Sequence, residues 1–158
     1  MLLSLFAAAA LAAAPLPAAS PDPDRVAIDA LVEDFRQAVI NRNGRALSEL
    51  MVDPLIPFLQ IDGQEGVDRR RRYNARYQGF DIPGFPGFAR MITESKVPVE
   101  ERFANIAVRT DGPMGMVTFD YQFIEDGKIS NVGLEHWVLR KIDGRWKILS
   151  VTWTSRAP

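Results

Sequence analysis

Two Asp-Gly pairs in the last third of the chain constrain its fold more than any other feature. Asp126-Gly127 and Asp143-Gly144 each lie between runs of β-branched, aromatic and other apolar residues. An Asp-Gly pair between such runs is one of the strongest short-range signals for a β-hairpin turn. Residues 99 to 155 are therefore predicted to form four consecutive antiparallel strands.

The two turns also predict how the strands pair. Two-residue turns would pair Glu125 with Lys128 and place Glu135 opposite both Thr118 and Thr152. Paired residues share a face, and neighbours along a strand alternate between faces. One face is therefore predicted to be almost wholly apolar, and the other to combine a polar band with an aromatic pad. The apolar face would hold Val117, Phe119, Tyr121, Phe123, Val132, Leu134, His136, Val138, Leu149, Val151 and Trp153. The mixed face would hold Thr118, Asp120, Gln122, Asn131, Gly133, Glu135, Ser150 and Thr152, followed by Trp137, Leu139, Trp146 and Ile148.

Residues 1 to 19 consist mainly of Leu, Ala and Phe and contain no charged side chain. This composition predicts a signal peptide that is cleaved near residues 18 to 20. The alternative is an N-terminal membrane anchor, but a helix that spans a bilayer needs about 20 apolar residues. We therefore expect a signal over residues 1–19 and a single domain over residues 20–158. The domain is expected to be exported to the periplasm or the extracellular space, with no later membrane span.

The charge balance and the lack of cysteine narrow the classes of function. The formal net charge of −1 argues against nucleic acid or an anionic membrane as the main partner. Without cysteine there is no disulfide, and His136 is the only histidine, so zinc sites built from Cys and His are excluded. Neither a metal nor a cofactor is expected. A homodimer is expected, because the apolar face is larger than a monomer normally exposes.

Helices and one edge strand are predicted before the hairpins. Asp22-Pro23 has the composition of a helix start, and the apolar residues that follow recur every three or four positions. Asn43-Gly44 would end this helix. A short helix up to Met51, an edge strand over residues 55–61 and a third helix over residues 65–77 are expected next.

The segment from Gly79 to Phe88 contains three phenylalanines among glycines and prolines. Such a composition is not typical of any regular element. Because the phenylalanines need apolar surroundings, the segment is interpreted either as an apolar lid or as a loop that packs permanently on the core.

The order of these elements and the closing pattern resemble the nuclear transport factor 2-like superfamily. The resemblance is carried by the amphipathic first helix before Asn43-Gly44 and by the segment from Trp137 to Ile148, in which Asp-Gly precedes Trp-Lys-Ile. The pattern is most similar to small bacterial branches related to ketosteroid isomerase and polyketide cyclases. The resemblance implies an α+β, cystatin-like fold: a cone-shaped, curved antiparallel sheet with three helices on its concave face. It also implies dimerisation through the convex side.

In such a cone the mixed face would line a pocket. Asp120 and Glu135 are the candidate catalytic residues, because a carboxylate in an apolar cavity can act as a general base near neutral pH. The alternative is an ordinary hydrogen-bonded pair of structural carboxylates. The candidate ligand-binding residues are Asn105, Thr118, Gln122, Thr152, Trp137, Tyr73, Tyr77, Phe85 and Phe88.

Three functions remain open from the sequence. The first is an exported pocket that binds a small apolar or amphipathic molecule. The second is an isomerase, cyclase or dehydratase with Asp120 or Glu135 as its base. The third is a structural dimeric interaction module whose cone is filled by its own side chains. The superfamily contains both enzymes and non-catalytic binders, so the fold alone does not choose between them.

Overall fold

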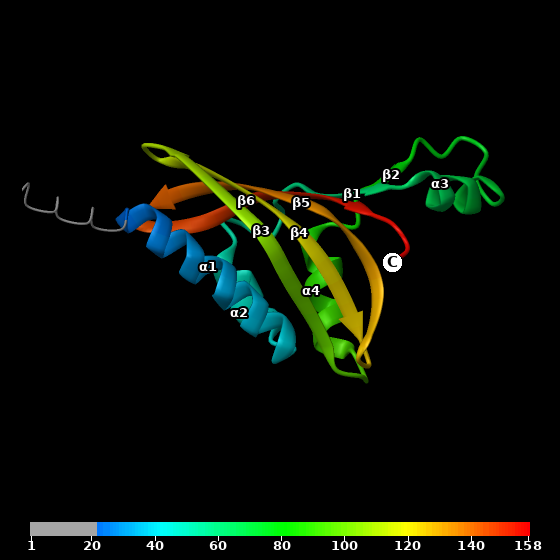
Figure 1. The fold of residues 1–158 in the computed structure, drawn as a ribbon, viewed down its shortest axis with the longest axis horizontal. Coiled ribbons are helices and arrows are strands. Elements are labelled where there is room, and N and C mark those ends of the chain that lie inside the picture. Colours follow the sequence, from blue (N-terminus) through cyan, green and yellow to red (C-terminus); the bar gives the residue numbers. More distant parts are fainter. Residues whose placement is uncertain (1–21) are drawn as a thin grey trace, which may run out of the picture.

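The computed structural model describes residues 22–158, and the signal peptide predicted over residues 1–19 lies outside them. The described residues form four helices and a single six-stranded sheet (Figure 1). The helices are α1 (Pro23–Ile40), α2 (Gly44–Leu50), α3 (Gln64–Arg71) and α4 (Phe85–Glu94). The strands are β1 (Phe58–Asp62), β2 (Phe80–Asp81), β3 (Val99–Asp111), β4 (Met114–Glu125), β5 (Lys128–Ile142) and β6 (Arg145–Ser155).

The sheet has the order β2-β1-β6-β5-β4-β3 and curves around helices α1, α2 and α4 without closing (Figure 1). The predicted α+β class and the four C-terminal strands are confirmed. The sheet is mixed rather than wholly antiparallel, because β1 pairs with β6 in parallel. Among residues 22–158, no helix combines the length and the apolar character that crossing a bilayer requires.

Helix α1 starts as predicted and ends earlier than predicted. The Asp22 side chain accepts a hydrogen bond of 3.0 Å from the backbone N–H of Asp24, and Pro23 occupies the first turn. The predicted end at Asn43-Gly44 is wrong, because Asn43 caps the start of α2 by accepting a 3.0 Å hydrogen bond from Ala46 N–H. An Asn side chain serves an N-cap well, since it satisfies a backbone donor that has no partner within the helix.

The segment predicted to be irregular contains the third helix of the concave face. Phe85 begins α4 with Pro86 in the first turn, a position that proline favours. The predicted helix over residues 65–77 is shorter, ends at Arg71, and lies with β2 at the far tip of β1 (Figure 1). Three helices therefore cover the concave face, as predicted, but the third of them is α4 and not α3.

A single hydrophobic core fills the space between helix α1 and the sheet. The apolar stripe of α1 is buried as its periodicity predicts, at Ile28, Leu31, Val32, Phe35, Ala38 and Val39. The ring of Phe35 lies 4.9 Å from that of Trp137 and 6.0 Å from that of Phe88. The N-terminal end of α1 is held by Asp24, whose Oδ1 accepts hydrogen bonds from Lys141 (2.6 Å) and Trp146 (3.2 Å).

Two β-bulges overturn the predicted register. Ile124 pairs with Ile129 but Phe123 pairs with Asn131, so that Ser130 is an extra residue in β5. In the same way, Leu149 is an extra residue in β6. A slip of one residue moves every following side chain to the other face relative to its partner strand.

As a result, side chains of β4 share a face with the β5 side chains that were predicted to lie on the opposite face. Phe119, not Thr118, lies opposite Glu135, and Tyr121 lies opposite Gly133. The predicted apolar outer face is therefore wrong: most of its large residues are turned toward the helices, at Val117, Phe119, Tyr121, Phe123, Val151 and Trp153. The homodimer was predicted because these residues were expected to form an exposed apolar face. The homodimer itself remains a prediction.

Candidate functional site

A cavity of about 440 Å³ opens between helix α4, strand β1 and the concave face of the sheet. Its volume falls within the range of small-molecule sites, about 300–1,000 Å³. One end of the cavity is polar and the other is apolar. The lining residues are Phe35, Phe58, Gln60, Pro83, Gly87, Phe88, Met91, Glu101, Tyr121, Phe123, Glu125, Ser130, Asn131, Glu135, Trp153 and Ser155.

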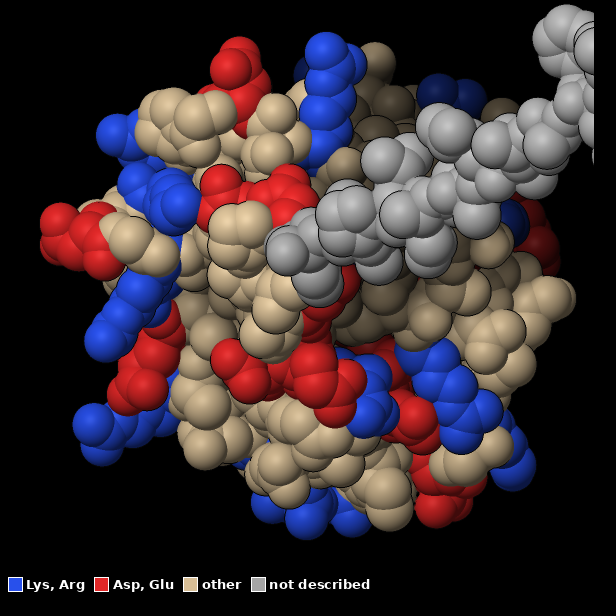
Figure 2. Space-filling model, turned by 60° about the vertical axis from the view of Figure 1, so that its left-hand side comes forward, with Lys and Arg blue, Asp and Glu red and all other residues tan. Residues whose placement is uncertain are grey.

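Two buried carboxyl groups dominate the polar end. Figure 2 shows acidic and basic side chains interspersed over one face of the molecule, whereas Glu101 and Glu135 are only 5% and 4% exposed. Trp137 Nε1 donates a 2.5 Å hydrogen bond to Oε1 of Glu135. No group among residues 22–158 donates a hydrogen bond to Oε2 of Glu101, although that oxygen is buried. A buried polar atom without a partner is uncommon, and a functional role or a bound water or ion is among its ordinary explanations.

Burial raises the pKa of both carboxyl groups. Removal from water is the largest cause for each of them, because it disfavours the charged form. The negative charge of Glu135 raises the pKa of Glu101 further, to well above its ordinary value of 4.5. Burial raises the pKa of Glu135 to about 7, against the opposing effect of the hydrogen bond from Trp137. Both carboxyl groups therefore hold a proton to a higher pH than an exposed glutamate does, and Glu135 gains and loses its proton near pH 7.

Tyr121 lies on the strand between these two carboxyl groups. Its hydroxyl oxygen is 2.7 Å from Asn131 Oδ1 and 3.0 Å from the backbone oxygen of Thr154. Burial, and then the charges of Glu135 and Glu101, raise the pKa of Tyr121. Gly133 faces Tyr121 on β5, and a Cβ atom at this glycine would overlap the Thr154 carbonyl oxygen. A glycine is therefore required where the backbones approach closely enough for Tyr121 to reach Thr154.

The apolar end of the cavity is built from aromatic rings. Phe58 comes from β1, Phe88 from α4 and Trp153 from β6. The Phe58 ring lies 4.8 Å from that of Trp153 and 5.2 Å from that of Phe88. Rings at these distances pack in tilted arrangements that aromatic side chains favour. They form a wall that suits a flat or bulky apolar group.

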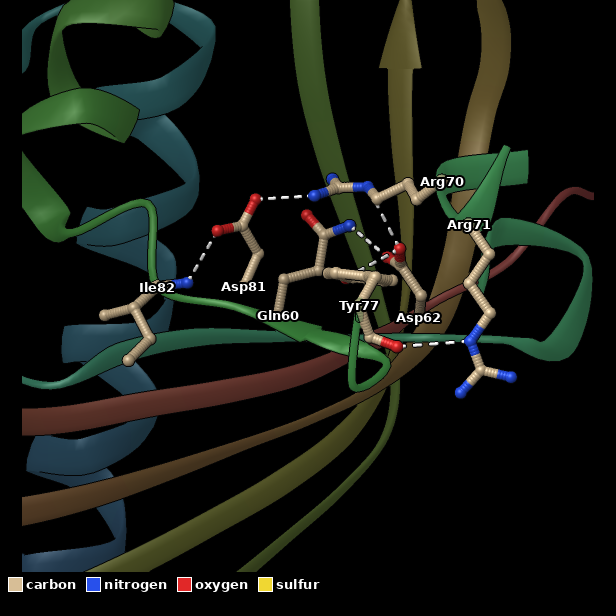
Figure 3. A network of polar contacts seen from close by, with 7 residues as sticks. All are labelled: Gln60, Asp62, Arg70, Arg71, Tyr77, Asp81 and Ile82. Atoms are coloured by element: carbon tan, nitrogen blue, oxygen red, sulfur yellow. Dashed lines mark hydrogen bonds and ion pairs between the residues drawn. The ribbon is translucent and has the colours of Figure 1, made fainter. Parts of the chain in front are cut away.

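A polar network fixes the part of the rim that contains Gln60 (Figure 3). Gln60 Nε2 donates a 2.6 Å hydrogen bond to Oδ1 of Asp62, and the Tyr77 hydroxyl donates one of 2.9 Å to Oδ2. Arg70 pairs with Asp62 at 3.2 Å and with Asp81 at 2.6 Å. The hydrogen bond from Arg70 lowers the pKa of Asp81. The network ties α3, β1 and β2 together and orients the Gln60 side chain at the cavity mouth.

The fold of the described residues is similar to that of several solved structures, although the sequence identity to them is low. No protein-family profile matches the chain, and no curated protein is similar to it in sequence. Solved structures with the same fold include a protein from Cytophaga hutchinsonii described as NTF2-like, which is 13% identical and has a TM-score of 0.62. The match covers 85% of this chain and 99% of that one. The fold is that of the nuclear transport factor 2-like proteins.

Two further structures with the NTF2-like fold have names that mention a reaction. A candidate scytalone dehydratase from Novosphingobium aromaticivorans is 12% identical, with a TM-score of 0.60 over 85% of each chain. A candidate dehydratase from Streptomyces avermitilis is 14% identical, with a TM-score of 0.59 over 88% of this chain and all of that one. At such identities the comparison establishes the fold, and the site has to be argued from this chain's own residues.

The NTF2-like cone contains only part of the predicted site. Glu135 and Phe88 line the cavity, and Trp137 lies beneath it as the hydrogen-bond donor to Glu135. Phe85 is buried in the core and does not line the cavity. Tyr73 is 89% exposed, and Tyr77 belongs to the Asp62 network at the rim.

The predicted meeting of Asp120 and Glu135 in one cavity is wrong. Asp120 is exposed on the convex face, where Asn105 Nδ2 donates it a 2.7 Å hydrogen bond. Thr118, Gln122 and Thr152 also lie outside the cavity, since the bulges at Ser130 and Leu149 change which side chains share a face. His136 pairs with Thr118 and Thr152 on this same outer face and is half-buried.

Glu101 is the functional residue that the sequence prediction missed. Glu101, on β3, pairs with Phe123 of β4, and Glu135, on β5, pairs with Phe119 of β4. Strand β4 therefore separates the two carboxyl groups in the sheet. A signal was available in the strand, because Val99, Glu101 and Phe103 occupy alternate positions. A carboxylate in the middle of an apolar alternation predicts either a buried acid or a break in the pattern.

Proposed function

We propose that the protein binds a small, amphipathic molecule in the cavity of about 440 Å³. The observation that carries this proposal is the buried, unpartnered Oε2 of Glu101 at the polar end of a cavity whose other end is walled by aromatic rings. Such an oxygen lowers stability unless a donor reaches it. A ligand with one polar end and an apolar body would satisfy the oxygen and cover the aromatic wall.

Gly87 offers a direct test of the cavity. It lines the cavity from helix α4, and a Cβ atom there would meet no other atom within 4 Å. We expect Gly87→Phe to fill the space without disturbing the helix, whereas Ala30→Phe on the exposed face of α1 is the matched control. Native mass spectrometry of protein purified from its own host should find a bound small molecule on the wild type and on the control, and none on Gly87→Phe.

The opposite result is equally clear. If the wild type carries no small molecule, and if an apolar fluorescent probe binds wild type and Gly87→Phe equally, the binding proposal is wrong. The cavity argues against the third function considered, a cone filled by its own side chains.

We further propose export, on the basis of the uncharged, apolar residues 1–19. N-terminal sequencing of the protein from the periplasm or medium would test it, with the first residue expected near position 20.

Proton transfer is a second candidate function, and the pKa of Glu135 favours it. A general base works best when its pKa is close to the working pH, and burial raises the pKa of Glu135 to about 7. Burial favours the protonated form of Glu101, which can donate a hydrogen bond to a substrate oxygen while ionised Glu135 takes a proton from carbon. Two carboxyl groups whose surroundings give them different protonation states are typical of acid–base sites. The dehydratase names of two structures with this fold are consistent with such chemistry.

A chromogenic probe tests proton transfer without knowledge of the substrate. Nitrobenzisoxazole opens to a coloured nitrophenolate when a base removes a proton from its ring carbon. We expect the wild type to accelerate this reaction with a midpoint near pH 7. Glu135→Gln should lower the rate by about 10²–10⁴-fold, whereas Asp120→Asn, on the convex face, should leave it unchanged. Equal rates for wild type and Glu135→Gln would refute this function.

A further inference from the structure

The walls of the cavity carry acidic groups and no basic ones. Glu101 comes from β3, Glu125 from β4 and Glu135 from β5, and Tyr121 is the only other titratable residue in the lining. As far as residues 22–158 form its walls, no Lys, Arg or His lines the cavity. The basic charge that influences Tyr121 is that of Arg156, which is exposed and has the smallest of the effects on the pKa of Tyr121. Within these walls an anionic ligand would meet no positively charged side chain of the described residues.

At the polar end, three side-chain donors already have partners and one carboxyl oxygen does not. Trp137 Nε1 donates to Glu135, the Tyr121 hydroxyl is shared between Asn131 and Thr154, and Gln60 Nε2 donates to Asp62. Oε2 of Glu101 remains without a partner. A group that carries N–H donors can satisfy this oxygen.

A positive charge would also remove the electrostatic penalty of the two carboxyl groups. Both are buried, no basic residue lies beside them in the cavity lining, and the charge of Glu135 disfavours the ionised form of Glu101. An ammonium group brings the missing charge together with three donors, and hydrogen bonds between charged partners are about twice as strong as neutral ones. The aromatic wall of Phe58, Phe88 and Trp153 would hold the apolar body of the same molecule.

We propose that the ligand of this cavity is a small organic cation, a protonated amine on an aromatic or bulky apolar body, whose N–H groups bond to Glu101 and Glu135. The inference rests on the binding function proposed above and names its ligand class. A neutral carbonyl compound would leave the acidic end without a counter-charge and is therefore not expected as the ligand. A carboxylate or a phosphate ester is not expected either.

Three compounds of nearly equal shape separate these possibilities: naphthylethylamine, naphthylethanol and naphthylpropanoate. Isothermal titration of the full-length protein near neutral pH is expected to rank the amine first. The amine should bind about tenfold to a hundredfold more tightly than the alcohol, the usual worth of a charged hydrogen bond. The propanoate should show no measurable binding. Amine binding should release protons, since an ammonium group lowers the pKa of the neighbouring carboxyl groups.

Variants assign the selectivity to the two carboxyl groups. Glu101→Gln and Glu135→Gln should each weaken amine binding by about tenfold or more and change alcohol binding by about threefold at most. Asp120→Asn is the matched control on the convex face and should bind all three compounds like the wild type. Gly87→Phe should abolish binding of the amine and the alcohol alike.

The failure of this inference can be told apart from the failure of the binding function. If the alcohol or the propanoate binds as tightly as the amine, or if the amine does not bind at millimolar concentration, the cation inference is wrong. The binding function would survive either result if Gly87→Phe still removes the ligand that the wild type retains from its host. A retained ligand without a basic nitrogen would also overturn the cation inference alone.

Discussion

Replacing Glu135 by Gln is expected to make the stability of the protein less dependent on pH. Glu135 is 4% exposed, and burial raises the pKa of its carboxyl group from the ordinary value of 4.5 to about 7. The native state therefore binds a proton more tightly than the unfolded chain does. When a group is more easily protonated in the native state, the free energy of unfolding falls as the pH rises.

The size of the effect follows from the two pKa values. Below about pH 4.5 the carboxyl group is protonated in both states, and its contribution is fully present. Between 4.5 and about 7 the unfolded chain loses the proton and the native state keeps it, so stability is lost progressively. Since each pKa unit corresponds to about 1.4 kcal/mol, the total loss is about 3 kcal/mol. Glu101 adds a loss of the same sign, because its pKa is also raised.

Urea unfolding, followed by tryptophan fluorescence at about pH 5, 6, 7 and 8, measures this loss. The free energy of unfolding of Glu135→Gln, taken relative to wild type, should rise by about 2–3 kcal/mol from the lowest to the highest pH. Asp120→Asn removes a carboxylate outside the cavity and should keep the wild-type decline. A difference between Glu135→Gln and wild type that is the same at every pH would refute the argument that burial controls this carboxyl group.

Three further predictions test the surroundings of the site. Trp137→Phe removes the hydrogen bond that lowers the pKa of Glu135, so NMR titration should find a higher pKa in the variant; an unchanged value would contradict the assignment. Gly133→Ala places a Cβ atom on the Thr154 carbonyl oxygen, and urea unfolding should show a loss of about 1–3 kcal/mol or more; wild-type stability would show that the two backbones separate freely. Phe35→Ala leaves a cavity in the core, where the ring is 1% exposed, and should lose about 3–5 kcal/mol by the same measurement; a loss below about 1 kcal/mol would mean that the core collapses to fill the space.

Much of the secondary structure follows from the local sequence. The Asp-Gly turns form as predicted, with positive φ at all four residues, since Asp and Gly tolerate the left-handed conformation that tight hairpin turns need. Helix α1 buries the stripe that its periodicity predicts, and Asp22 caps its start. These features depend on neighbours within about four positions, which is why the residue pattern alone is sufficient for them.

The extra residues in β5 and β6 show where local reasoning stops. Ser130 and Leu149 have side chains that fit an ordinary strand, and nothing in their neighbourhood predicts a bulge. The bulges bring Val117, Phe119, Tyr121 and Phe123 onto the same side as Trp137, so that these apolar side chains are buried in one core. With the simple two-residue register, that set would lie on the outer face.

The candidate site depends on the same choice. The local residue pattern was sufficient to predict strand β1, the four C-terminal strands, the two Asp-Gly turns and helix α1, and it singled out the Glu135 carboxylate as a candidate. Packing between distant segments sets the meeting of Glu135 and Glu101 in one cavity and the position of Asp120 on the other side of the sheet. Side chains along a strand alternate between the two faces with a period of two. One bulged residue, stabilised by packing between distant segments, therefore changes which carboxyl groups meet, and no local pattern records it.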